Sequence, residues 1–409
     1  MLSRYTPRGP LWKYLGGAAA SRAGDEMTGP ALLLLGFAVT GRPATGSALL
    51  AGLTIAAALG GPAFGAMLDR SPRPDRVLAV TLAVYAAGIV AVAAAVGRLP
   101  VPAAVLLALA AGLFNPAVAG GWTAQLPRIV AGPELDRGFA LDAMSYSAAS
   151  LAGPALAAGV AAALGARIAV ITAAALVVLA VPSARSLSRF PPSRAGARPI
   201  GAGQAGAQAL RQVAAGFAAI VTRRPLLRAT LTSVVSYAGI GMLLVCCPVL
   251  GAQRLGGSAR GALLISAIAV ASLTANSVLA RWRPRGQPDV RVLASTLVIG
   301  ASMAATAAAP GWLTMAAVAL GGAGEGPQLT ALFAVRHRES PEHMRGQIFT
   351  TAASLKIGGL AVGAALAGPL AGRSVTACLL VAAAIELSAA AAYLLVPGAK
   401  PRSASGGCA

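Results

Sequence analysis

The feature that most constrains this chain is a series of twelve apolar segments, each close to the length of a helix that crosses a bilayer. They fall near residues 13–40, 46–68, 77–97, 101–124, 139–164, 166–184, 225–250, 258–280, 292–309, 311–335, 346–371 and 374–396. A helix needs about 20 mostly apolar residues to cross the hydrocarbon core. The sequence therefore predicts an all-α membrane protein with twelve transmembrane helices. The first segment runs straight into ALLLLGFAV, so we interpret it as an uncleaved span rather than a signal peptide.

The amino-acid composition is typical of a membrane-embedded protein. Only 11% of the 409 residues are charged, and 57% are hydrophobic. A soluble protein carries about 25% charged residues, so this chain has too few charges to coat soluble domains. A net charge of +21 is also found in proteins that bind nucleic acid, so nucleic acid has to be considered as a partner. The basic residues lie in short segments between apolar runs, however, and no aromatic stacking platform accompanies them. We expect the bilayer, and no nucleic acid, as the partner.

The distribution of Lys and Arg predicts the orientation of the chain. If the N-terminus is cytoplasmic, the segments on the inside hold 25 Lys and Arg, and the turns on the outside hold 6. Because basic residues favour the cytoplasmic side, we expect both termini to be cytoplasmic. Arginine greatly outnumbers lysine, which is typical of a GC-rich bacterial genome. We therefore expect a multi-pass protein of the bacterial inner (plasma) membrane.

The two halves of the chain resemble one another. The dipeptide PL at 10–11 recurs at 225–226, Pro116 corresponds to Pro327, and PELDRG at 133–138 recurs as PEHMRG at 341–346. Matches in one order at a nearly constant offset indicate a duplicated unit of six spans, as in many transporters. We predict an N-terminal half at 1–184, a cytoplasmic linker at 185–224, a C-terminal half at 225–397 and a cytoplasmic tail at 398–409.

The linker contains one amphipathic stretch. Leu210, Val213, Phe217 and Ile220 fall on one face of a helix. This pattern indicates a short helix on the inner leaflet, but a flexible linker explains the segment equally well.

The loop after the second span carries a motif with a known counterpart. GAMLDRSPRPDR at 65–76 resembles the loop motif of the major facilitator superfamily through Gly65, Asp69, Arg70 and Arg73, with Arg76 in place of a later basic residue. SRAGDEMTG at 21–29 is similar to the opening of the first helix in drug exporters of that family. Gly153-Pro154 is similar to the core of its antiporter motif, although alanines replace the glycines that follow. The resemblance implies the major facilitator fold and points to the branch of proton-coupled drug and metabolite exporters.

The same resemblance implies a cytoplasmic gate. Asp69 would cap the start of the eleventh span near Gly346 when the inside is closed, because a helix N-terminus attracts negative charge. Gly65 would belong to this gate, and basic residues would complete its charge cluster, namely Arg70, Arg73, Arg76, Arg128 and Arg345. The alternative is that these residues serve only as topology determinants.

Ionisable residues within spans are costly and so point to function. Arg22, Asp25 and Glu26 lie at i, i+3 and i+4, which lets both acids reach the arginine. Glu325 and Lys356 lie at matching depths in adjacent spans and could pair. We expect these five residues to couple proton movement to transport, with Asp25 and Glu325 as entry points and the two cations as their partners. Static ion pairs are the alternative.

Polar and aromatic side chains in spans are candidates for a substrate cavity. They are Asn115, Phe114, Tyr146, Tyr237 and Gln328. Asn115 and Gln328 adjoin prolines, so they could equally bond freed backbone groups. We also expect Asp142 to belong to the cytoplasmic charge cluster, and we assign no role to Glu386.

Signals for an enzyme or a cofactor are weak. His337 and His343 have no third ligand for a metal, and no phosphate-binding Gly-x-x-x-x-Gly-Lys-Ser/Thr motif is present. Together with these absences, the resemblance to proton-coupled exporters implies a monomeric transporter without cofactor that exports lipophilic or amphipathic small molecules in exchange for protons, as in multidrug resistance. A dedicated siderophore or antibiotic exporter, an uptake symporter or uniporter and, more remotely, a membrane-embedded transferase remain alternatives.

Overall fold

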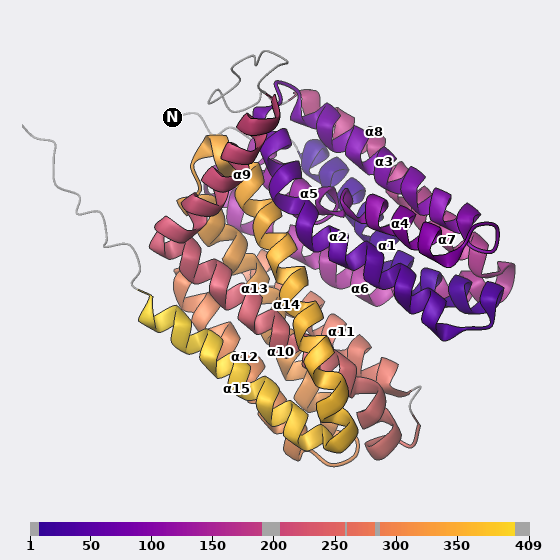
Figure 1. Ribbon diagram of the computed structural model, residues 1–409. Helices are drawn as coiled ribbons and strands as arrows, with labels where there is room; N and C mark the ends of the chain where they lie inside the picture. The colour runs from indigo at the N-terminus through magenta and orange to yellow at the C-terminus, as the bar shows by residue number, and fades with distance from the viewer. Residues whose placement is uncertain (1–7, 190–204, 258–259, 283–286, 397–409) are drawn as a thin grey trace, which may run out of the picture.

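The computed structural model describes residues 8–189, 205–257, 260–282 and 287–396. Within these ranges the chain forms α-helices and short 3-10 turns, and the only β pairing is an isolated bridge between Val96 and Leu99. Figure 1 shows two helical bundles side by side, one from each half of the chain. The all-α prediction is therefore confirmed.

Eight helices of the first half form the N-terminal bundle. They are α1 (Arg8–Thr40), α2 (Pro43–Arg70), α3 (Pro74–Ala95), α4 (Val101–Gly112), α5 (Gly120–Ile129), α6 (Leu135–Leu164), α7 (Ala166–Leu179) and α8 (Val181–Ser186). Helices α4 and α5 together make up one predicted span, and α7 and α8 together make up another, so this bundle contains six spans.

Six long helices form the C-terminal bundle, and α9 (Ala205–Thr222) precedes them. They are α10 (Arg224–Arg254), α11 (Gly261–Trp282), α12 (Pro288–Ala308), α13 (Leu313–Glu339), α14 (Arg345–Arg373) and α15 (Val375–Leu395). Among the described residues, ten helical segments are long and apolar enough to cross a membrane. The other two long helices, α1 and α13, are those that carry Arg22, Asp25, Glu26 and Glu325.

Proline interrupts one span and leaves another continuous. Pro116 lacks an N–H group and its ring clashes with the carbonyl four residues earlier. That carbonyl belongs to Gly112, where α4 ends, and a 3-10 turn at Asn115–Ala117 follows. Pro327, by contrast, lies inside an unbroken α13. Glu325 therefore lies in regular helix.

The glycines of α13 allow close packing on α11. A Cβ atom at Gly322 would lie 2.1 Å from the carbonyl oxygen of Ile268. One at Gly326 would lie 2.7 Å from that of Ser272. Small residues spaced four apart let membrane helices approach each other closely, so these glycines bring α13 against α11.

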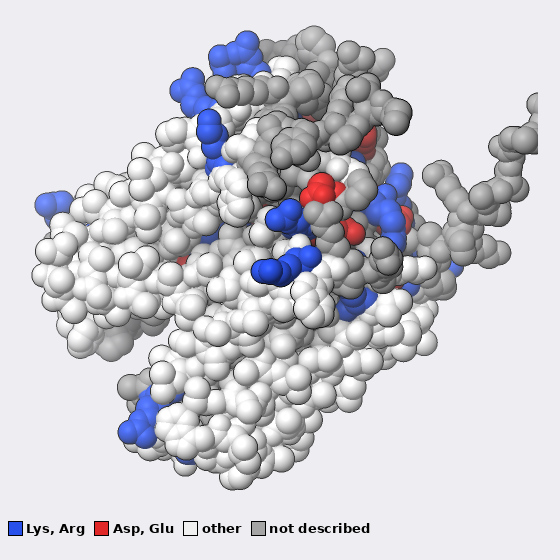
Figure 2. All heavy atoms as spheres, turned by 180° about the vertical axis from the view of Figure 1, so that it is seen from behind, with Lys and Arg blue, Asp and Glu red and all other residues white. Residues whose placement is uncertain are grey.

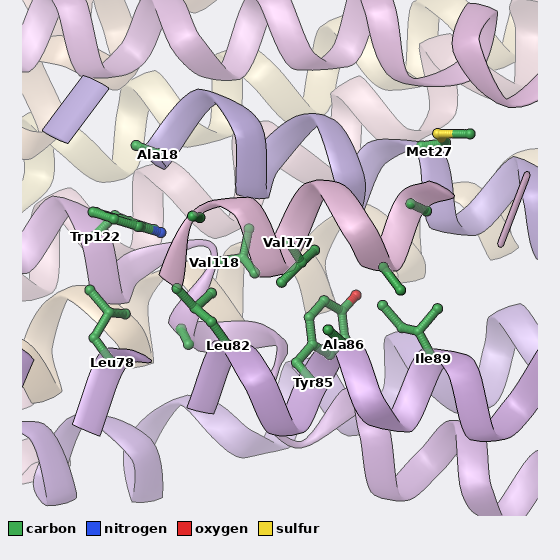
Figure 3. Close-up of a cluster of buried hydrophobic side chains, with 14 of the residues drawn as sticks. Ala18, Met27, Leu78, Leu82, Tyr85, Ala86, Ile89, Val118, Trp122 and Val177 are labelled. Atoms are coloured by element: carbon green, nitrogen blue, oxygen red, sulfur yellow. The ribbon is translucent and has the colours of Figure 1, made fainter. Parts of the chain in front are cut away.

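Each bundle has its own apolar core. In the N-terminal bundle Trp122, Tyr85 and Leu82 are completely buried with neighbours from α3, α5 and α7, and Figure 3 shows these side chains packed between the helices. A second core joins α10, α11, α12 and α15. The first core also includes Leu329, Phe333 and Ala334 of α13 and Phe349 of α14, so the two bundles are in apolar contact with each other.

The bundles meet at one end of the molecule. We call this end the basic end; it is where α2 ends at Arg70 and α14 begins at Arg345. Figure 2 shows Lys and Arg gathered there, while the two lobes are separated by a hollow toward the opposite end. The described hydrogen bonds between α2 and α14 lie between the basic end and mid-helix. The structure is thus closed at the basic end and open at the other.

Candidate functional site

Asp25 is held within the N-terminal bundle by two neutral donors. Tyr85 donates its hydroxyl to Asp25 Oδ1 over 2.5 Å, and Asn115 Nδ2 donates to the same oxygen over 2.6 Å. Asn115 can reach α1 because Pro116 breaks the helix at this depth. Asn115 therefore contacts a carboxylate that we predicted to carry protons. The sequence analysis did not identify Tyr85 as a site residue, because in the apolar sequence of α3 it looks like an ordinary core residue.

Arg22 pairs with Asp142 rather than with its neighbours in α1. Arg22 Nη1 lies 2.8 Å from Asp142 Oδ1, and both side chains are at most 2% exposed. Tyr14 donates to the same oxygen, and Thr123 donates to Asp142 Oδ2. The expected contacts of Arg22 with Asp25 and Glu26 are not among its described partners, and Asp142, expected in the cytoplasmic charge cluster, is instead buried against Arg22. Spacing along a helix shows which residues share a face, but not which neighbouring helix offers a better partner.

Two tyrosines link the bundles through Lys356. The guanidinium of Arg22 lies 3.7 Å from the centre of the Tyr146 ring in α6. Lys356 Nζ in α14 lies 5.5 Å from that ring and 4.3 Å from the ring of Tyr237. Such contacts stabilise a cation on an aromatic face. Successive cation–ring contacts therefore connect the N-terminal bundle to the C-terminal bundle, in the order Arg22, Tyr146, Lys356 and Tyr237.

Glu325 reaches this chain of contacts through Tyr237. The Tyr237 hydroxyl donates to Glu325 Oε1 over 3.3 Å. Glu325 and Lys356 do not form an ion pair within 4 Å among the described residues, so the direct pair that we expected is replaced by a shared tyrosine. Tyr146 and Tyr237, predicted only as cavity-lining residues, are therefore central to the site.

Glu26 lies where α1 and α6 cross. Its Oε1 accepts a hydrogen bond from Ser150 over 3.0 Å. A Cβ atom on Gly153 would lie 2.6 Å from Glu26 Cβ, so only glycine fits at this crossing. The Gly153-Pro154 motif therefore sets the distance between α1 and the helix that carries Tyr146, while Pro154 itself is exposed.

Gln328 belongs to a polar network inside the C-terminal bundle. Its Nε2 donates to Thr296 over 2.8 Å and to Ser236 over 3.2 Å. Ser236 in turn donates to Glu386, which is fully buried. This network joins α10, α12, α13 and α15. Gln328 is completely buried, so it holds helices together instead of lining the cavity that we predicted.

Asp69 contacts the start of α14 at the basic end. The main-chain N–H groups of Gly346 and Gln347 donate to Asp69 Oδ1 and Oδ2, each over 2.7 Å. Arg345 is close enough to interact electrostatically with the same carboxylate. A carboxylate that accepts two N–H groups at a helix N-terminus is a charge-assisted cap. Here the cap joins the two bundles.

The contact between α2 and α14 continues toward the centre. Thr350 donates its hydroxyl to the carbonyl of Gly61, and Ser354 donates to that of Ala57, each over 2.7 Å. A Cβ atom on Gly65 would lie 2.2 Å from Thr350 Oγ1. Glycine is thus required at the crossing, which explains its place in the loop motif.

The basic residues predicted for the gate differ in their surroundings. Arg73 and Arg76 are exposed, whereas Arg70 and Arg128 are partly buried. Arg128 donates to Gln125 and interacts electrostatically with Asp75. Arg345 acts electrostatically on Asp69.

An aromatic cluster closes the space between the centre and the basic end. Phe139 of α6, Phe333 of α13 and Phe349 of α14 have ring centres 6.0 to 6.4 Å apart. Tyr146 lies 6.3 Å from Phe333. We call the three phenylalanines the aromatic plug. Phe114, in contrast, packs partly buried against the core of the N-terminal bundle.

Arg336 was missed as a site residue. It counted as one of the basic residues beyond the tenth span, but it lies inside α13 and is 2% exposed. Its Nε and Nη2 have no hydrogen-bond partner among the described residues.

Helix α9 packs on the closed end. Ile220 is buried with Leu226 and Ile348, and Gln347 Nε2 donates to the carbonyl of Val213 over 3.2 Å. The predicted helix in the linker is therefore present, and it contacts the gate as well as α10. The side chain of Leu210 and the tail at 398–409 lie outside what the structure describes.

Comparisons with known proteins agree with this architecture. A sequence profile of the Major Facilitator Superfamily matches residues 14–353. The chain is 28% identical over 411 residues to an uncharacterised MFS-type transporter, y4rN, of Sinorhizobium fredii, covering 95% of each. It is also similar in fold to the human organic anion transporter MFSD10 (TETRAN), with a TM-score of 0.76 and 15% identity, covering 95% of this chain and 99% of that one. The E. coli fucose:proton symporter FucP gives 0.72 and 13%, covering 96% and 100%.

A bacterial homologue of the iron transporter ferroportin, in an outward-facing state, gives a TM-score of 0.72 at 17% identity and covers 94% of this chain and 98% of that one. Structural likenesses at such identities show the fold alone. The transported species named for these three proteins differ, so the fold does not fix a substrate.

Proposed function

This chain belongs to the major facilitator superfamily and is a transmembrane transporter, and we propose that it is a proton-driven antiporter that exports lipophilic or amphipathic small molecules by alternating access. The observation that carries the proposal is the set of ionisable side chains at mid-depth. Asp25, Glu26, Glu325 and Lys356 are all partly accessible. Glu325 accepts a hydrogen bond from Tyr237, and Lys356 lies over the rings of Tyr237 and Tyr146, while Asp25 and Glu26 belong to α1 of the other bundle. Ionisable residues at this depth mark ion pathways in membrane proteins.

The gate supports alternating access. We propose that the basic end is cytoplasmic, because Lys and Arg gather on that side of membrane proteins. The Asp69 cap, the aromatic plug and α9 would then close the cytoplasmic side, and the hollow in Figure 2 would face outward. Opening would require the two hydrogen bonds from the Gly346 and Gln347 N–H groups to Asp69 to break, and the bundles to rock about the central site.

The proposed cycle uses the carboxylates as proton sites. In the outward-facing arrangement, protons from outside would reach Asp25 and Glu325. A protonated Asp25 no longer accepts from both Tyr85 and Asn115 as a carboxylate does, which weakens the contact between α1, α3 and the interrupted fourth span. Protonation of Glu325 would loosen its hold on Tyr237, the neighbour of Lys356. Substrate from the cytoplasm would then displace the protons after the gate opens.

Inside-out vesicles test this proposal. With a proton gradient established, a panel of chemically diverse lipophilic compounds is added, and proton release from the lumen is followed. Release with several unrelated compounds that compete with one another supports a broad exporter. A single saturable compound supports a dedicated exporter of one metabolite. Release with none, together with uptake in right-side-out vesicles, would replace the proposal with an uptake symporter or uniporter.

A further inference from the structure

The charges of the central site are unequally satisfied. Each acid accepts a hydrogen bond from a neutral side chain: Asp25 from Tyr85 and Asn115, Glu26 from Ser150 and Glu325 from Tyr237. Arg22 has its own carboxylate in Asp142. Two cations differ from these residues, and both belong to the C-terminal bundle.

Lys356 is the first of these cations. Its ammonium lies over the rings of Tyr237 and Tyr146, and it forms no hydrogen bond or ion pair with any described residue. The side chain is partly accessible. Aromatic faces satisfy only part of an ammonium group, and none of its three N–H groups has an acceptor among the described residues.

Arg336 is the second. Two of its buried nitrogens have no hydrogen-bond partner among the described residues, although the side chain is only 2% exposed. A buried arginine without an anion is strongly unfavourable. The chain would gain stability from an apolar residue here, so a partner that comes from elsewhere is the physical reason to keep a cation.

The two cations act on the same region. Arg336 follows Glu325 by eleven residues, close to three full turns, so both lie on one face of α13. Long helical side chains lean toward the helix N-terminus, which here is toward the central site. Lys356 interacts electrostatically with Arg336, which repels it, and with Glu325 and Glu26, which attract it. Phe333 and the rest of the aromatic plug lie at the same level.

We propose that the substrate is an amphipathic organic anion whose acidic group binds between Lys356 and Arg336 while its apolar part packs on the aromatic plug. This inference rests on the proposed function, because it assigns a substrate class to the same site. A carboxylate or sulfonate supplies acceptors to both cations, and Arg binds such groups through two parallel hydrogen bonds. The plug supplies aromatic surface from α6, α13 and α14, so opening the gate would expose Arg336 and the rings together.

Equilibrium binding to the purified, full-length protein in lipid nanodiscs tests the substrate class without any gradient. The probes are matched triplets that share one apolar group: phenylacetate, naphthylacetate and biphenylacetate, each with its amide and its amine. We expect the carboxylates to bind about tenfold or more tightly than the amides. Equal or tighter binding of amides or amines overturns the proposal, and so does a failure of all three carboxylates to bind.

Variants assign the preference to the two cations. Arg336→Met and Lys356→Met should each remove most of the preference for carboxylate over amide, and Arg336→Lys should keep part of it. Arg373→Met, which removes an exposed cation at the other end of α14, should leave the preference unchanged. A preference that persists in both Arg336→Met and Lys356→Met overturns the assignment.

Thermal stability separates a binding role from a structural one. Without ligand, Arg336→Met should unfold at a higher temperature than the wild type, because a buried cation without a partner has been removed. A lower unfolding temperature means that Arg336 serves the fold, and overturns the proposal. If the protein prefers carboxylates but no compound causes proton release, the anion site stands and proton antiport is refuted. If only amines cause proton release, antiport stands and the anion site is refuted.

Discussion

Replacing Asp69 with asparagine should shift the transporter away from the arrangement that is closed at the basic end. The asparagine side chain keeps one oxygen, so one of the two N–H groups of Gly346 and Gln347 loses its acceptor, and the negative charge at the helix terminus is lost. Hydrogen bonds to a charged group contribute about 1.5–3 kcal/mol each, and the helix terminus adds about 0.3–1 kcal/mol. We therefore expect a loss of about 3 kcal/mol, or about a hundredfold in the ratio of closed to open populations.

Distances between spin labels measure this shift. One pair, at Ala131→Cys and Gln287→Cys, reports the separation of the bundles at the basic end, where both positions are exposed. A second pair, at Arg42→Cys and Gln253→Cys, reports the opposite end. In Asp69→Asn the first distance should lengthen and the second should shorten. The described cysteines Cys246, Cys247 and Cys378 are buried, so they compete little for label.

Asp136→Asn provides the matched control. Asp136 is an exposed acid in the first turn of α6 at the same end, and its loss should leave both distances unchanged. Unchanged distances and normal transport in Asp69→Asn, at wild-type abundance in the membrane, would refute the gating argument. Asp69 would then act only in membrane topology.

Three further predictions concern packing and coupling. Gly65→Ala should impair closure because its Cβ would lie 2.2 Å from Thr350 Oγ1, whereas Gly368→Ala, with open space around it, should transport normally; labelled distances and transport check both. Asp142→Asn should destabilise the purified protein by about 3–5 kcal/mol, and an apolar replacement of both Arg22 and Asp142 should recover much of the loss in thermal unfolding. In a double-mutant cycle, Glu325→Gln and Lys356→Gln should couple through Tyr237 by more than about 0.5 kcal/mol in transport at constant abundance; additive effects would contradict the link.

Local patterns in the sequence were sufficient for much of the fold. Apolar length located the spans, and the proline at 116 marked a real break because its clash with Gly112 is a local effect. Pro327, by contrast, lies within the continuous helix α13. Both prolines occur in apolar spans, so the local sequence did not distinguish the interrupted span from the continuous one.

The site was predictable in its residue types but less so in its pairs. Asp25, Glu325 and Lys356 were identifiable because charge within an apolar run is costly. Their partners were not, since Asp142 lies 120 residues from Arg22, and Tyr85 lies 60 residues from Asp25. Arg336 was misread because an arginine near the end of a span looks like a topology signal until its burial is known.

Proton movement in reconstituted proteoliposomes tests the central claim most directly. The wild type, Asp25→Asn and the control Asp136→Asn are compared at equal protein content, with a compound that binds all three. We predict that the compound drives proton movement in the wild type and in Asp136→Asn, and that this movement is lost in Asp25→Asn. Substrate movement without any proton movement in the wild type, or proton movement that is undiminished in Asp25→Asn, would contradict the account.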